Sequence, residues 1–219
     1  MTWLFVTLLG YTLLAFSDVI NKYLLESSLP NPRFFTFSVG ILGGLVILLL
    51  PFGVVSIPSL GIFVLALFAG AFRMAGLLSL FSGLSRFEIS RIIPAIGGLL
   101  PLFVIALTMA LSKEAVSFSQ QEIIAFVLLI LGSVFVSIER KKLLTLKSLT
   151  FSVVAALSFA LSFVFSKFVY DAQTFLSGLI WIGFGSVATS FFFLGFAEVR
   201  ESLRSIFTKK KGGRAMPKK

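Results

Sequence analysis

The chain is organised as seven long apolar runs, each separated from the next by a short polar or proline-containing break. A helix needs about 20 apolar residues to cross the roughly 30 Å hydrocarbon core of a bilayer, and the runs are close to that length. They extend from Trp3 to Leu24, Phe34 to Val55, Leu60 to Leu84, Ile89 to Leu111, Ile123 to Ile138, Leu149 to Tyr170 and Phe175 to Ala197. The pattern predicts an all-α fold, a polytopic membrane helix bundle of about seven transmembrane helices. Because the breaks are short, consecutive spans should pack antiparallel.

At an offset of 145 residues, the end of the first apolar run aligns with the end of the sixth. Leu13–Leu24 (LLAFSDVINKYL) falls on Ser158–Val169 (SFALSFVFSKFV) with four identities in twelve positions, and farther along Gly40 falls on Gly185. Chance similarity between apolar segments is one explanation, and an internal repeat is the other. A repeat of five spans is inverted in its second copy because five is odd, and inverted repeats are common in secondary transporters.

The repeat interpretation divides the chain into three parts. Residues 1–142 form one five-helix repeat, residues 143–199 form the first two helices of an inverted second repeat, and residues 200–219 form a basic tail. We expect helix faces left without a second repeat to bind a homodimer partner or a separate partner half.

Composition agrees with a membrane protein and removes several kinds of chemistry. Hydrophobic residues make up 58% of the chain and charged residues 13%, and the mean hydropathy is +1.06. The sequence contains no cysteine and no histidine, which excludes disulfides, thiolate metal sites and imidazole bases. We therefore expect no metal, no cofactor and no enzymatic activity, and we expect the lipid bilayer to be the main partner.

The distribution of Lys and Arg predicts the orientation. If the basic break at 139–142 is cytoplasmic, sixteen basic residues lie on that side and two, Lys113 and Lys167, on the other. By the positive-inside rule, this predicts an external N-terminus and a cytoplasmic C-terminal tail in the plasma (inner) membrane. The net charge is +10, and for the tail from Arg200 to Lys219 we expect anionic lipid headgroups rather than nucleic acid as the partner.

A series of motifs follows the third apolar run. It consists of Ser85-Arg86, Pro94, Pro101-Leu102-Phe103, Leu111-Ser112-Lys113-Glu114 and Leu131-Gly132-Ser133-Val134. The series resembles the EamA-type permeases of the drug/metabolite transporter superfamily. Their repeat has a proline-bearing fourth helix, a short turn with a glutamate and a fifth helix with a glycine near its end. Lys22 and Lys167, which correspond at the repeat offset, are also similar to the family's pattern.

The resemblance implies a secondary transporter or permease that moves small organic metabolites or drug-like solutes by alternating access. The chain departs from the family in three respects. Many members have both termini in the cytoplasm, which would place the basic break at 139–142 outside, opposite to the charge count. The family has ten helices, where this chain has seven apolar runs, and Lys113 and Ala115 replace the glycine and arginine that usually flank the glutamate. Two other interpretations therefore stay open, an incomplete permease half that needs a partner and a non-transporting integral membrane protein.

Two charged residues fall deep inside predicted spans. Arg73 lies near the middle of the third run, where an uncompensated charge costs on the order of 3 kcal/mol, and Asp18 is the only carboxylate well inside a run. We expect both to face the bundle interior, as an ion pair or as two walls of a polar cavity. A purely structural pair is the alternative.

Polar residues near Asp18 are further candidates for a substrate pathway. Lys22 lies one turn from Asp18 and either pairs with it or extends to the membrane interface. Lys167 is likewise expected either to form an ion pair or to extend to the interface. Ser17 and Asn21 lie four residues apart on one face and either bind substrate or hold helices together.

Prolines and aromatic residues complete the candidate set. Pro94 and Pro101 lie seven residues apart, on one face of the fourth run, and are expected to kink or loosen that helix. Tyr170 and Trp181 are candidates for the wall of a solute pocket.

Overall fold

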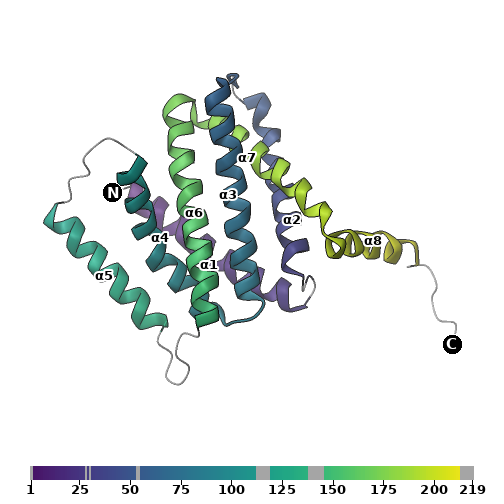
Figure 1. Cartoon of the computed structure of the whole chain (residues 1–219), viewed down its shortest axis with the longest axis horizontal. Helices are drawn as coiled ribbons and strands as arrows, with labels where there is room; N and C mark the ends of the chain where they lie inside the picture. The colour runs from purple at the N-terminus through teal and green to yellow at the C-terminus, as the bar shows by residue number, and fades with distance from the viewer. Residues whose placement is uncertain are drawn as a thin grey trace.

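The structure is a computed structural model, and it describes residues 2–27, 29, 31–52, 55–111, 119–137 and 146–212. Within these ranges the regular elements are all helical. They are α1 (Thr2–Ser27), α2 (Pro32–Gly43), the 3₁₀ helix η1 (Gly44–Phe52), α3 (Leu60–Leu84), α4 (Ile89–Leu111), α5 (Gln120–Ser137), α6 (Leu146–Ala172), α7 (Phe175–Phe192), the short 3₁₀ turn η2 (Phe193–Gly195) and α8 (Ala197–Gly212). Figure 1 shows their arrangement.

Six of the described helical segments are long and apolar enough to cross a membrane. They correspond to α1, α2 with η1, α3, α4, α6 and α7 with η2. The predicted all-α class is confirmed, and the six segments support a multi-pass membrane protein. The fifth predicted span falls in α5, where the apolar helix Ile123–Gly132 is shorter, so the number seven stays a prediction.

The second span changes its helix type partway along. Asn31 caps the start of α2, since its side-chain oxygen accepts hydrogen bonds from the backbone N–H groups of Arg33 at 2.9 Å and Phe34 at 3.3 Å. Pro32 occupies the first turn, where its missing N–H costs nothing. From Gly44 onward the backbone continues as the 3₁₀ helix η1, which contains Pro51. The tighter 3₁₀ winding spans more length per residue than an α-helix.

The centre of the bundle is formed by α3, α6 and α7. Small residues let these helices approach closely, since a Cβ atom on Gly70 of α3 would fall on the backbone of Gly185 and Ser186 of α7. The Ser162 hydroxyl of α6 donates to the Ala69 carbonyl of α3 at 2.8 Å. Consecutive helices such as α4 and α5 do pack together, but the largest interfaces join α3 with α6, α4 with α6 and α3 with α7. Contacts between consecutive spans are thus present, and the most extensive contacts join helices that are not consecutive.

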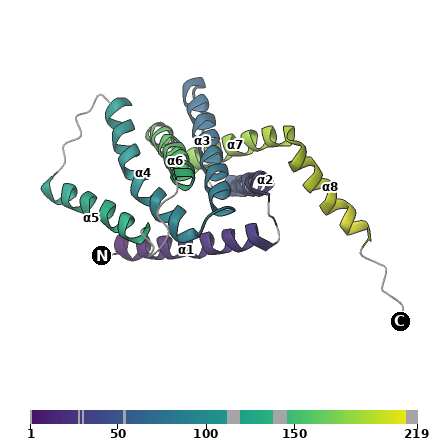
Figure 2. The ribbon, with the colours of Figure 1, turned by 60° about the horizontal axis from the view of Figure 1, so that its bottom comes forward.

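The helix α1 lies outside this centre. It crosses the ends of α3 and α4 steeply instead of running beside them (Figure 2). Most of its large apolar side chains are exposed, among them Phe5 at 69% and Phe16 at 65%, while Leu25 near its end is buried. Its contact with the bundle is therefore concentrated at its C-terminal end.

The predicted basic tail is helical throughout its described residues, 200–212. The helix α8 begins at Ala197, and the buried side chain of Val199 packs in one cluster with Phe34, Met74 and Phe193. Residues 112–118 and 138–145, which include the predicted glutamate turn and basic loop, and residues 213–219 lie outside the described residues.

Candidate functional site

Lys22 fixes the end of α1 to the bundle. Its ammonium group donates to the backbone carbonyls of Leu84 at 2.6 Å and Phe87 at 3.0 Å, and it pairs with Glu26 at 2.9 Å. The two carbonyls belong to the end of α3 and the turn that follows it. Of the two roles predicted for Lys22, pairing with Asp18 is not observed, because Glu26 on the next turn takes that place.

The predicted ion pair between Asp18 and Arg73 is not formed. Asp18 is half-buried, Arg73 is exposed, and no salt bridge joins these two described residues. Of the two predicted arrangements, the ion pair is therefore not observed. The physical reason is the crossing of α1, which places only its C-terminal end against α3 (Figure 2). That Asp18 and Arg73 line one polar cavity stays a prediction.

The two charged residues nevertheless lie on related helix faces. Arg73 shares a helical stripe with Leu80 and Leu84, seven and eleven residues later, and Asp18 shares one with Leu25. Leu25, Leu80 and Leu84 are buried in a single cluster, which is where the two stripes meet. Asp18 therefore lies two turns before this contact on α1, and Arg73 lies two to three turns before it on α3.

Arg73 lies one turn after Ala69 on α3, the helix against which α6 with Tyr170 packs. Tyr170 stacks on Phe175 with ring centroids 5.5 Å apart. Tyr170 and Trp181 both pack against the buried cluster of Ala66, Ala69, Val169 and Ile182. The structure therefore brings two of the predicted site residues, Tyr170 and Trp181, to one cluster, and Arg73 lies outside it, one turn beyond Ala69 on α3.

The prolines of α4 do not interrupt it. Pro94 and Pro101 lie inside one continuous helix from Ile89 to Leu111, and both are half-buried. Each proline removes one backbone hydrogen bond and leaves a carbonyl four residues earlier without its helical donor. Between them Gly98 is buried, while Gly97 has open space where a side chain would be.

The remaining predicted residues lie apart from that group. Lys167 is exposed on α6 and pairs with Asp171 at 3.6 Å. Ser17 is exposed and Asn21 half-buried on α1. The structure brings neither side chain to Tyr170 or Trp181, so a single site formed by all the candidates is not observed.

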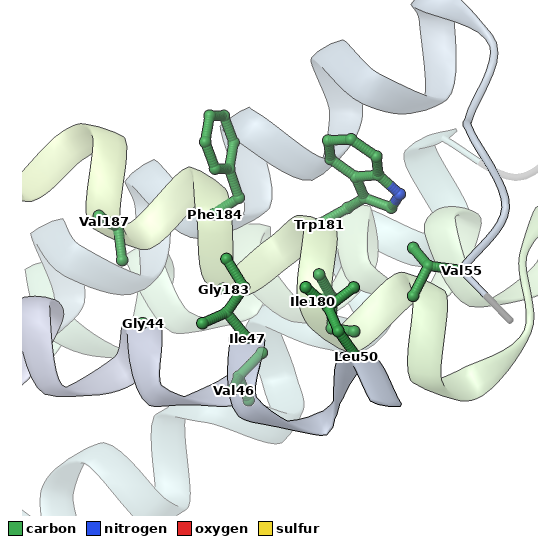
Figure 3. A pocket seen from close by; sticks show the side chains of 10 residues that line it. All are labelled: Gly44, Val46, Ile47, Leu50, Val55, Ile180, Trp181, Gly183, Phe184 and Val187. Atoms are coloured by element: carbon green, nitrogen blue, oxygen red, sulfur yellow. The ribbon is translucent and has the colours of Figure 1, made fainter. Parts of the chain in front are cut away.

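An apolar pocket that the sequence did not reveal lies between η1 and α7 (Figure 3). It has a volume of about 440 Å³. Its lining consists of Gly44, Val46, Ile47, Leu50, Val55, Ile180, Trp181, Gly183, Phe184 and Val187. Only Trp181 had been singled out from the sequence. The pair Gly44 and Gly183 was the available signal, but glycines in apolar helices more often mark close packing than a pocket.

A small polar cluster follows the pocket at the Val55 end. The Trp181 ring N–H donates to the Ser56 carbonyl at 3.1 Å, and the Ser56 backbone N–H donates to the Ser177 hydroxyl at 3.0 Å. The Ser56 hydroxyl also bonds the side-chain oxygen of Gln173, and the Thr174 hydroxyl bonds Ser177 at 3.0 Å. The cluster carries no charge, and the described part of the chain shows no group of acidic residues able to hold a metal.

Basic residues gather at the opposite end of the bundle, where α1 and α3 end and α2, α4 and α6 begin (Figure 1). The described members are Lys22, Arg33, Arg86, Arg91 and Lys147. At this end α8 is held against α2, since Arg33 bonds Glu198 at 3.0 Å and its guanidinium lies 4.6 Å from the centre of the Phe196 ring.

Comparison with protein-family models, with curated proteins and with solved structures found no match to this chain. The resemblance to EamA-type permeases therefore stays a prediction.

Proposed function

We propose that the chain is a secondary transporter of small organic solutes that works by alternating access. The observation that carries the proposal is the exposed Arg73 near the middle of α3. A charge at membrane depth is costly unless it meets water, a partner or a substrate, and such residues commonly mark solute pathways. Arg73 and Tyr170 would contact the solute, and an anionic or zwitterionic group suits the guanidinium.

The hinge for such a transporter would lie at the end of α1. Lys22 and the buried Leu25 hold this end against α3, while the rest of α1 has little contact with the bundle. A swing of α1 toward α3 would bring Asp18 toward Arg73, since the two residues lie on stripes that meet at Leu25. In α4 the backbone hydrogen bonding is weakened at Pro94 and Pro101, where the helix could bend.

The test is uptake and efflux of a solute panel in proteoliposomes. The full chain is compared with Arg73→Gln and with a matched control, Arg200→Gln, which removes an exposed arginine of α8. We expect transport of one solute class, at least a tenfold loss in Arg73→Gln and no change in the control. Equal transport by both variants would contradict a role for Arg73, and no transport by folded wild-type chain would contradict the proposal as a whole.

A second candidate function is a permease half that is completed by a partner, and the contrast between α1 and α6 favours it. At the offset of 145 residues, Thr2–Ser27 corresponds to residues 147–172, close to α6 (Leu146–Ala172). The Lys22–Glu26 pair then falls on the Lys167–Asp171 pair. The two helices thus share length and a paired charge near the end, which supports the interpretation as a repeat.

The positions shared by α1 and α6 differ in their surroundings. Ala160, Ser162 and Val164 are buried in α6 at 0%, 3% and 3% exposure. Their counterparts Ala15, Ser17 and Val19 are exposed. A partner half that covers α1 as α3 and α4 cover α6 would bury them. The discriminating measurement is the mass of the protein in native-like membrane particles, where a monomer that transports would rule this candidate out.

The orientation belongs to the same proposal. The basic end formed by Lys22, Arg33, Arg86 and Lys147 would face the cytoplasm together with α8. Cysteine labelling tests it directly because the chain has no native cysteine. A Ser205→Cys variant in α8 should react with an impermeant maleimide only after the cells are opened, and labelling in intact cells would reverse the orientation.

A further inference from the structure

We infer that the pocket between η1 and α7 holds one acyl chain of a membrane lipid, whose headgroup lies at the polar cluster of Ser56, Gln173 and Thr174. The pocket lies on the outer surface of two membrane helices, and several of its walls are open to the bilayer. Ile47 is 55% exposed, Phe184 49% and Leu50 41%. An acyl chain from the surrounding lipid can therefore enter from the side without crossing the protein.

The chemistry of the lining selects an apolar occupant. Nine of its ten residues offer no polar side-chain atom, and the tenth, Trp181, already gives its ring N–H to the Ser56 carbonyl. A polar solute would lose its hydrogen bonds to water and find none in return. The volume of about 440 Å³ lies within the ordinary range for ligand pockets.

The pocket is bounded where η1 and α7 approach closely at two glycines. A Cβ on Gly44 would come within 2.9 Å of the Val187 side chain, and a Cβ on Gly183 within 3.1 Å of the Val46 side chain. In the 3₁₀ winding of η1, residues three apart project together, so Ile47 and Leu50 form one wall. The opposite wall is the Ile180–Phe184 stretch of α7.

The polar cluster lies at the end of the pocket where a headgroup would be. Ser56 directly follows the lining residue Val55, and Thr174 and Gln173 lie between α6 and α7 at the same end. Tryptophan is enriched at the boundary between headgroups and hydrocarbon, and Trp181 connects the pocket to the cluster through its bond to Ser56. The hydroxyl and amide groups of the cluster suit the phosphate and ester oxygens of a zwitterionic phospholipid.

Trp181 provides the probe for the experiment. The chain has two tryptophans, so a Trp3→Phe background leaves Trp181 as the only one. The full chain in nonionic detergent micelles is titrated with phosphatidylcholine brominated on its acyl chains. We expect quenching of Trp181 that saturates at one lipid per chain. Ile47→Phe, which fills the pocket, should raise the half-saturating lipid concentration at least tenfold.

Leu48→Phe is the matched control. Leu48 directly follows Ile47 on the same helix and is 64% exposed, but it does not line the pocket, so its quenching curve should match that of the background. If circular dichroism shows that Ile47→Phe is unfolded, Leu50→Phe takes its place. Gln173→Ala should weaken binding a few-fold through loss of the headgroup contact.

Three outcomes would overturn the inference. Quenching that rises linearly with the lipid-to-detergent ratio would show contact with bulk lipid only. Identical curves for Ile47→Phe and Leu48→Phe would place the quencher elsewhere. Displacement of the brominated lipid by decane as effectively as by lysophosphatidylcholine would indicate an apolar solute pocket in which the headgroup has no part.

Discussion

The packed centre of the bundle and the helix α1 are built from similar sequence but have opposite surroundings. Val164 of α6 is 3% exposed and its counterpart Val19 of α1 is 60% exposed, although the two helices correspond at the 145-residue offset. In water an apolar helix so exposed would be unstable, but in a bilayer the lipid is as apolar as leucine. Hydrophobicity therefore does not decide which helix becomes the centre. Small residues and interhelical hydrogen bonds decide which helix lies at the centre. Each of these features can be removed from a central helix, and the effect can be compared with the same change on α1.

The largest difference should come from glycine. Gly70→Val places methyl groups on the backbone of Gly185 and Ser186, where α3 and α7 meet, whereas Gly10→Val on α1 enters open space. We expect Gly70→Val to lower the free energy of unfolding by about 3 kcal/mol. Gly10→Val should change it by less than about 0.5 kcal/mol. The measurement is equilibrium unfolding by SDS titration in mixed micelles, followed by circular dichroism. Equal losses would mean that α1 is packed as tightly as the centre.

A matched pair of alanines should give the next largest difference. Ala160 of α6 is fully buried, and its counterpart Ala15 is exposed. Ala160→Leu inserts three carbons into a filled space and should cost about 2 kcal/mol in the same titration. Ala15→Leu should be close to neutral as long as α1 has no partner. If a partner half does cover α1, Ala15→Leu will leave the isolated chain unchanged and weaken its association with that partner.

The two corresponding lysines should differ less. Lys22 holds two backbone carbonyls of the bundle, and hydrogen bonds to a charged group are worth about 1.5 to 3 kcal/mol. Lys167 makes an exposed pair with Asp171 and lies 5.9 Å from the centre of the Phe168 ring, and such exposed pairs contribute from about zero to 1 kcal/mol. We therefore expect Lys22→Met to cost about 1.5 kcal/mol and Lys167→Met less than about 0.5 kcal/mol. Limited proteolysis at the 27–31 connection should also become faster in Lys22→Met, because its side chain anchors the end of α1. If Lys167→Met proved the more damaging change, the anchor would lie on α6 instead.

Much of the helix layout was accessible from the sequence. The spans Leu60–Leu84 and Ile89–Leu111 were predicted with the bounds that the structure shows. A turn with polar residues, such as the one around Arg86, and a bilayer-length apolar run determine such bounds locally. The 3₁₀ winding after Gly44 and the helix α8 were missed. Charge alone predicts a basic tail. The four-residue spacing of Val199 and Leu203, which pack in one apolar cluster, is the signal in the sequence for the helix α8.

The candidate site was less accessible. The position of Arg73 relative to Tyr170 and the lining of the pocket depend on which helices meet, and hydropathy carries no information about that. The predicted Asp18–Arg73 pair assumed that α1 runs beside α3. In the structure α1 crosses α3 and is bonded to the end of α3 through Lys22. The sequence does not reveal these contacts.

The smallest expected effect on the free energy of unfolding concerns Ser162 of α6 and its counterpart Ser17 of α1. This pair tests the difference between the two helices most directly. The Ser162 hydroxyl is buried and donates to the Ala69 carbonyl at 2.8 Å, while Ser17 is exposed. Hydrogen bonds between helices inside membranes average about 0.6 kcal/mol, so Ser162→Ala should cost about that much. Ser17→Ala should have no measurable effect on the isolated chain.

Cysteine variants of the same two serines can show whether a partner protein covers α1, without a measurement of the small energy of one hydrogen bond. Because the chain has no cysteine, Ser17→Cys and Ser162→Cys each introduce a single thiol. In detergent, where water reaches the helix surface, a maleimide should label Ser17→Cys quickly because its side chain is exposed, and should label Ser162→Cys slowly because α3 covers it. Slow labelling of Ser17→Cys in a complex extracted together with its partner half, with fast labelling of the isolated chain, would show that the partner covers α1. Fast labelling of both would contradict the packing of α6 against α3, on which the whole comparison depends.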